Sequence, residues 1–287
     1  MSTQRKKVAL VIGSGSVKCA AALGLWKVLE RAGIKLDMLV GCSGGSIYAA
    51  VMALGYDVAT CERLTRELWT PDITRRRDTR SILSALFPGL FGFKGSFGMI
   101  SDEPLRRALE QPFGGYQFAD AKVPLHIVAT DLADGQKVVL NQGNVADAVR
   151  ASISIPYIWK PWCIDGRWLL DGCLNDPLPV DVAIREGADI ILAMGFESPY
   201  PRRIRSAMRY AFQVNSIYTN NLLRANYSFH NLAHHAEIVP ILPDFGREIR
   251  LFDTDQFPHV IECGERAMEE ELDHIRQELE APSVRLA

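Results

Sequence analysis

The chain has 287 residues, of which 48% are hydrophobic, so it is long enough to bury the core of one large domain. Its formal net charge is −2, from 32 basic and 34 acidic side chains, and this balance argues against a nucleic-acid-binding protein. Its six cysteines form no C-x-x-C pair, and no stretch reaches the roughly 20 apolar residues of a membrane-spanning helix. We therefore expect a cytoplasmic protein whose contact with a membrane would be peripheral.

The first predicted unit is a strand over Lys7 to Ile12, a glycine-rich turn and an amphipathic helix that ends near Arg31. Such a turn at a helix N-terminus presents backbone N–H groups that can stabilise an oxyanion. The candidate turn residues are Gly13, Gly15, Ser16, Val17 and Lys18, with Gly15 and Ser16 as the preferred donors. A dinucleotide site is the alternative, but its G-x-G-x-x-G pattern is broken because Lys18 occupies the third glycine position. No cofactor is expected.

The second predicted unit carries the sequence Gly41-Cys42-Ser43-Gly44-Gly45 between a strand over Met38 to Gly41 and a helix that continues to Leu54. A G-x-S-x-G pattern between a strand and a helix is typical of a nucleophile elbow, a strained turn that exposes a serine hydroxyl. Glycines flank the serine because larger side chains would crowd the turn. The alternative interpretation is an ordinary tight turn that contains a serine.

The next stretch contains an apolar insertion, Phe87 to Ile100, between predicted helices over Val58 to Leu68 and Asp102 to Gln111. Four phenylalanines alternate with glycines there, and a basic run, Arg75 to Arg77, precedes them. We interpret residues 85–100 as a mobile loop that covers an acyl pocket or touches a lipid interface. The alternative is that its aromatic rings pack beneath the domain.

Strands and helices alternate through the remainder, which predicts an α/β fold with a mostly parallel sheet between helical layers. Further strands are expected at Leu125 to Asp131, Lys137 to Asn141, Trp168 to Leu170, Ile190 to Met194 and Glu237 to Pro240, and further helices at Val145 to Ala151, Val180 to Glu186, Arg203 to His234 and Gln256 to Leu279. No linker divides the chain, so we expect a single domain over 1–287, with its motifs within about 7–196 and a helical C-terminal extension over about 203–280.

A base for Ser43 cannot be selected from the residues alone. Asp131, Asp165, Asp171 and Asp176 are all candidates, and Asp171 follows a short apolar strand and precedes Gly172. None of the six histidines lies in a motif that would signal a Ser-His-Asp triad. His230 and His234 are four residues apart, but no carboxylate partner at ligand spacing accompanies them, so no metal site is expected.

In order and spacing, these motifs resemble those of the bacterial patatin-like phospholipases. The resemblance covers about residues 7–196 and rests on the turn Gly13 to Lys18, the elbow Gly41 to Gly45, the segment Arg150 to Pro156 with Lys160-Pro161, the pair Asp171-Gly172, and the closing segments Pro177 to Val180 and Gly187 to Met194. The chain departs from the usual family residues at Lys18, Cys19, Cys173 and Asp176. These departures leave the substrate preference open.

The resemblance implies a three-layer patatin-like fold and a Ser43-Asp171 dyad without histidine. Ser43 would attack an ester carbonyl, Asp171 would accept its proton, Gly172 would support the aspartate, and the glycine turn would hold the oxyanion. The expected function is hydrolysis of lipid acyl esters, of the phospholipase or lysophospholipase type. An acyltransferase or thioesterase on the same dyad, or a non-catalytic lipid-binding protein, is the alternative. The oligomeric state is left undetermined.

Overall fold

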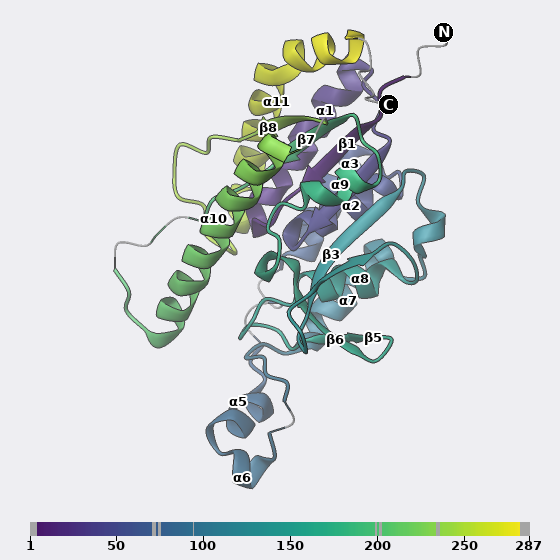
Figure 1. The fold of residues 1–287 in the computed structure, drawn as a ribbon. Helices are drawn as coiled ribbons and strands as arrows, with labels where there is room; N and C mark the ends of the chain where they lie inside the picture. Colours follow the sequence, from purple (N-terminus) through teal and green to yellow (C-terminus); the bar gives the residue numbers. More distant parts are fainter. Residues whose placement is uncertain are drawn as a thin grey trace.

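The centre of the fold is an eight-stranded mixed sheet in the order β5-β6-β3-β2-β1-β7-β8, with β4 also paired to β3 (Figure 1). It is seen in a computed structural model that describes residues 5–70, 73, 76–93, 95–198, 200, 203–233 and 236–281. The strands are β1 Val8–Ile12, β2 Met38–Cys42, β3 Leu125–Asp131, β4 Lys137–Leu140, β5 Trp162–Ile164, β6 Arg167–Asp171, β7 Ile190–Met194 and β8 Glu237–Ile241. Strands β3, β2, β1, β7 and β8 are parallel, whereas β4 and β6 run antiparallel to β3.

Helices cover both faces of this sheet. They are α1 Ala21–Ala32, α2 Gly44–Ala53, α3 Val58–Leu68, α5 Thr79–Leu86, α6 Pro88–Phe91, α7 Asp102–Phe113, α8 Val145–Ser152, α9 Val180–Arg185, α10 Ala207–Ala233 and α11 Phe257–Glu280. The predicted α/β fold with a mostly parallel sheet between helices is confirmed.

Strand β1 shows how the sheet separates two hydrophobic cores. Its five residues are fully buried, as continuous apolar strands between two helical layers should be. Val8, Leu10 and Ile12 pack into the larger core with α1, α2, α3, α7, α8 and α11, while Ala9 and Val11 face a smaller core with α9 and α10. The period-2 alternation of a strand thus assigns each side chain to one layer.

The C-terminal segment contributes to the sheet as well as to the helical layers. Strand β8 pairs in parallel with β7, and α11 packs along α1. The two helices approach closely at Gly24 and Gly264, where an added Cβ would lie 1.9 Å from the carbonyl oxygen of Ile261 and 2.0 Å from that of Ala21, respectively. Backbone contact of this kind requires glycine on each helix.

The segment expected to be a loop at residues 85–100 begins at the end of α5 and contains α6; these two short helices form a hairpin that projects from the body beyond β5 and β6 (Figure 1). Its apolar side chains are exposed, with Leu86 at 66%, Phe87 at 55% and Leu90 at 79%. The alternative that these rings pack beneath the domain is therefore wrong for Phe87. Among the described helices, none is long and apolar enough to cross a membrane.

Two other local expectations are corrected. The helix predicted to follow the glycine turn starts as a 3-10 turn, Ser16–Ala20, and becomes α-helical only at Ala21. Strand β5 was not predicted, because three partly exposed residues at a sheet edge carry too short a pattern.

Candidate active site

Ser43 occupies a sharp turn between β2 and α2. Its φ of 53° and ψ of −130° are a conformation that side-chain-bearing residues rarely adopt. Glycines permit the tight packing around it: a Cβ at Gly41 would lie 2.5 Å from the Cα of Ser46, and one at Gly45 would lie 2.2 Å from the carbonyl oxygen of Ile12. The strand-turn-helix context expected of a nucleophile elbow is therefore present.

The structure brings Ser43 and Asp171 together across 128 positions of sequence. The Ser43 hydroxyl donates a hydrogen bond of 2.7 Å to Oδ2 of Asp171. Ser43 is 6% exposed and Asp171 is fully buried. A hydroxyl so close to a carboxylate can transfer its proton directly, without an intervening histidine.

The sheet register explains this meeting. Cys42 of β2 is opposite Val128 of β3, and the next residue of β3, Ala129, is opposite Asp171 of the antiparallel strand β6. Strands β2 and β6 thus pair with successive residues along β3, so that Ser43 and Asp171 meet where the two strands end. Gly172 makes the approach possible, because a Cβ there would lie 2.3 Å from the carbonyl oxygen of Val128.

The protein environment makes Asp171 a stronger base than an ordinary aspartate. Burial raises the pKa of its carboxyl to about 6, although hydrogen bonds from the Ser43 hydroxyl and the Cys173 backbone act in the opposite direction. Its Oδ1 accepts the Cys173 N–H at 2.9 Å, while the Thr130 hydroxyl donates to its main-chain carbonyl at 3.0 Å. These contacts fix the carboxylate with Oδ2 directed at Ser43.

Sequence reasoning missed Ser152, which holds the backbone of the elbow. The Ser43 N–H donates to the Ser152 hydroxyl at 2.9 Å, and that hydroxyl donates to the Val128 carbonyl at 2.6 Å. Ser152 is fully buried at the end of α8. Its only sequence signal is its place in the segment Arg150 to Pro156, which was noted for family resemblance without a role for the hydroxyl.

The glycine turn lies directly against the elbow. A Cβ at Gly44 would be 2.9 Å from the backbone nitrogen of Ser16, so the Ser16 amide is beside the residue that follows the serine. Within the part of the chain that the structure describes, the N–H groups of Gly15, Ser16 and Val17 have no hydrogen-bond partner. They are available as oxyanion donors.

The other two turn residues have different contacts. The Gly13 N–H donates to the Met194 carbonyl at 2.9 Å and the Lys18 N–H to the Gly15 carbonyl at 3.1 Å, so neither amide is free. The Lys18 ammonium donates to the main-chain carbonyl of Glu197 at 2.6 Å, and burial lowers its pKa to about 8. Gly13 and Lys18 thus tie the turn to the end of β7.

Two of the three rival acids are bound to other side chains, and the third is exposed. Asp131 accepts from Arg167 at 2.7 Å, Asp176 accepts from Lys137 at 2.7 Å and from Asn226 at 3.0 Å, and Asp165 is exposed. The Asp176 carboxylate is therefore part of an ion pair with Lys137 that includes neither Ser43 nor Asp171.

The histidines do not complete a triad in the described structure. His126 is buried within β3 beside Val40, and burial lowers its pKa. His234 and His235 lie outside the described residues, as does the side chain of His230. Among the residues with described placement, no group of three or more His, Cys, Asp or Glu side chains could hold a metal.

Comparison with known proteins adds independent information on ancestry. Residues 10–184 match the family model described as patatin-like phospholipase. An uncharacterised NTE family protein of Mycobacterium tuberculosis is 31% identical over 189 residues, which cover 66% of this chain and 48% of that protein. Human patatin-like phospholipase domain-containing protein 6 is 29% identical over 189 residues, or 65% of this chain and 13% of that protein. This chain thus spans about half the length of the mycobacterial relative and a much smaller part of the human one.

Solved structures share the fold at low sequence identity. Human GIVD cytosolic phospholipase A2 aligns with a TM-score of 0.54 and 10% identity, covering 96% of this chain and 62% of that one. VipD from Legionella pneumophila aligns with a TM-score of 0.52 and 14% identity, covering 94% and 67%. At these identities, the two structures show only that the fold is shared.

Proposed function

This chain belongs to the patatin-like phospholipase family, and we propose that it hydrolyses acyl esters of lipids through an acyl-serine intermediate on Ser43, with Asp171 as the base. Phospholipid or lysophospholipid is the proposed substrate class. One observation carries the proposal: the Ser43 hydroxyl, on a strained turn, donates to a fully buried carboxylate at 2.7 Å.

In the first half-reaction the Ser43 oxygen attacks the ester carbonyl carbon while its proton passes to Oδ2 of Asp171. The carbonyl oxygen becomes an oxyanion, which the free N–H groups of Gly15, Ser16 and Val17 stabilise. The carbon–oxygen bond to the leaving group then breaks, and that oxygen takes the proton from Asp171. The acyl group remains on Ser43.

In the second half-reaction a water molecule attacks the acyl-serine carbonyl and gives a proton to Asp171. The same N–H groups hold the new oxyanion. When the bond to Ser43 breaks, the serine oxygen recovers its proton from Asp171, and a carboxylic acid leaves. The raised pKa of Asp171 suits both steps, because the carboxylate must accept and return a proton near neutral pH.

The test is turnover of para-nitrophenyl esters together with labelling by a fluorophosphonate probe. Ser43→Ala should abolish labelling and turnover, and Asp171→Asn should lower kcat by orders of magnitude. Asp165→Asn is the matched control, since it removes an exposed carboxylate that takes no part in the hydrogen bonds of Ser43 and Asp171, and it should change neither labelling nor turnover. Thermal melts establish that each variant is folded.

Two outcomes would contradict the proposal. Labelling of Ser43→Ala would mean that the probe reacts elsewhere, and full activity in Asp171→Asn would require another base. Hydrolysis is separated from acyl transfer by product analysis with an isotopically labelled acyl donor, where free acid is the expected product even when alcohols or thiols are added.

We also propose peripheral contact with a lipid surface through the α5–α6 hairpin. The exposed side chains Leu86, Phe87 and Leu90 support it, and the exposed Arg80 on α5 provides a positive charge that would favour anionic head groups. Arg75, Lys94 and Arg202 lie outside the described residues. All six cysteines are free thiols, which supports the proposed reducing, cytoplasmic location.

A further inference from the structure

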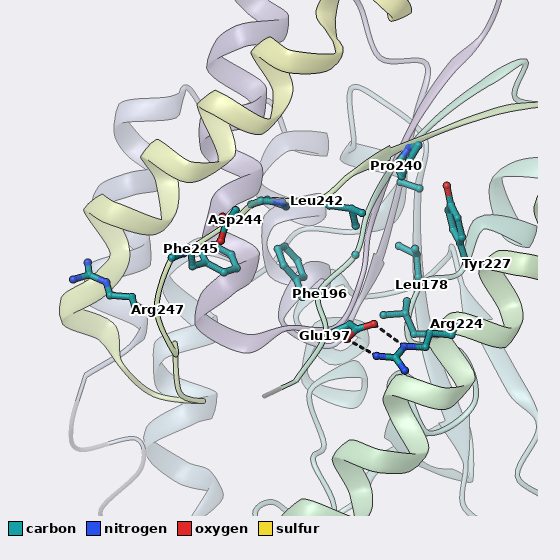
Figure 2. A pocket seen from close by; sticks show the side chains of 15 residues that line it. Leu178, Phe196, Glu197, Arg224, Tyr227, Pro240, Leu242, Asp244, Phe245 and Arg247 are labelled. Carbon is teal, nitrogen blue, oxygen red and sulfur yellow. Dashed lines mark hydrogen bonds and ion pairs between the residues drawn. The ribbon is translucent and has the colours of Figure 1, made fainter. Parts of the chain in front are cut away.

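A cavity of about 480 Å³ lies between the carboxyl ends of β7 and β8 and one side of α10 (Figure 2). Its apolar wall includes Leu178, Phe196, Leu223, Leu242 and Phe245. The Phe196 and Phe245 rings stack with centroids 6.2 Å apart. A mostly apolar cavity of this size is of the kind that binds small molecules.

The charged groups of this cavity are balanced. Glu197 and Arg224 form a two-pronged ion pair at 2.7 and 2.8 Å, visible as the dashed lines in Figure 2. Asp244 and Arg247 provide one further charge of each sign. With two acids and two bases, the lining has no excess charge to select an anionic head group, and its wall favours a hydrocarbon.

The cavity is next to the proposed oxyanion turn. Phe196 is their shared wall: a Cβ added to Gly15 would lie 2.6 Å from the Phe196 ring, so the ring touches the turn on one side and the cavity on the other. Leu178 makes a second contact, 3.1 Å from the position of a Cβ on Gly13. Lys18 makes a third contact between the turn and the cavity lining, because its ammonium donates a hydrogen bond to the main-chain carbonyl of Glu197.

The sheet order gives the distance from the nucleophile. Ser43 follows β2, the glycine turn follows β1 and Phe196 follows β7, and these three strands are neighbours. At about 4.8 Å per strand, the end of β7 is roughly 10 Å from the end of β2. Since each carbon–carbon bond adds at most about 1.5 Å, an acyl chain on Ser43 needs at least about seven bonds to reach it.

We propose that this cavity binds the distal part of the acyl chain whose carbonyl lies at Ser43, and so selects esters of medium and long chains. The inference rests on the proposed function, which it deepens by naming a chain-length subsite. The chain would run along the carboxyl edge of the sheet, over the glycine turn, and place its terminal methylenes between Phe196 and α10.

The first test compares kcat/KM for para-nitrophenyl esters from butyryl to dodecanoyl, kept below their micellar concentrations. Butyryl is too short to reach the cavity, whereas each methylene added from octanoyl onward should raise kcat/KM by up to about fourfold. Leu223→Trp, which fills the cavity from α10, should flatten this rise. Tyr218→Trp is the control, because Tyr218 is on the same helix but is 71% exposed and outside the cavity.

The second test does not need turnover. In Ser43→Ala, displacement of a fluorescent fatty-acid probe by dodecanoate should require at least tenfold more dodecanoate when Leu223→Trp is added, but not when Tyr218→Trp is added. If no ester is hydrolysed, the proposed function fails, while this measurement still examines the cavity. An unchanged chain-length profile and unchanged displacement in folded Leu223→Trp protein would overturn the subsite.

Discussion

Replacement of Ser152 by alanine isolates the hydrogen bond that holds the elbow. The change leaves two fully or nearly buried backbone groups unpaired, the Ser43 N–H and the Val128 carbonyl. An unpaired buried polar group costs about 1 to 3 kcal/mol, so the free energy of unfolding should fall by at least about 2 kcal/mol. At about 2 to 4 °C per kcal/mol, the melting temperature should fall by at least about 4 °C.

The same change should lower activity beyond its effect on stability. Without the Ser152 acceptor, the strained turn can relax and move the Ser43 oxygen away from the oxyanion donors, and misplacement on the order of 1 Å costs roughly 100-fold in rate. The assay is kcat/KM on a short, soluble ester, together with the rate of fluorophosphonate labelling, at a temperature well below the melt of the variant.

Ser154→Ala is the matched control. Ser154 is also fully buried on the same segment, and its hydroxyl accepts from Arg150 at 2.7 Å and donates to the Arg150 carbonyl at 3.0 Å. Its loss should destabilise the fold comparably while the Ser43 N–H keeps its acceptor. Equal falls in kcat/KM for the two folded variants would refute the idea that Ser152 positions the nucleophile.

Because Asp171 must be ionised to accept a proton and burial raises its pKa to about 6, kcat/KM should rise with pH through about 6 and fall about tenfold per unit below it; a flat profile between pH 5 and 7 would contradict the assignment. Gly45→Ala should cost about 3 kcal/mol or more in a denaturant titration, because its Cβ would lie 2.2 Å from a carbonyl oxygen, whereas Gly89→Ala, with open space around it, should be neutral. Leu90→Ser with Phe91→Ser should reduce hydrolysis of anionic vesicles several-fold but leave turnover of a dissolved short ester unchanged, and equal loss on both would argue against lipid contact by the hairpin.

The parts of the fold that were predictable have strong local patterns. Continuous apolar runs such as Val8–Ile12 and Ile190–Met194 indicate strands buried on both faces, and Val58–Leu68 was predicted with the bounds that the structure has. The α5–α6 hairpin was missed because its helices, of eight and four residues, are shorter than the window over which helical periodicity can be recognised, and α6 also lies in a stretch rich in glycine and phenylalanine.

The candidate site also has parts that could be predicted from the sequence and parts that could not. The elbow was predictable because glycines at fixed offsets are needed for its backbone geometry, but Asp171 was selected only by family resemblance. Its pairing with Ser43 depends on the register of β2, β3 and β6, which no local pattern specifies. Ser152 acts through one hydroxyl whose partners are 109 and 24 positions away, so the residue type alone gives no indication of its role.

The long sequence separation between Ser43 and Asp171 also has a consequence during synthesis. With 128 positions between them, and a chain that grows at about 5 to 20 residues per second, the serine precedes the aspartate by roughly 6 to 26 s. Throughout that interval the nascent chain carries the proposed nucleophile without its base. The proposed catalytic pair is completed only when β6 adds to β3 as an antiparallel strand, so recovery of ester hydrolysis during refolding would report this late, non-local pairing and not the earlier formation of helices.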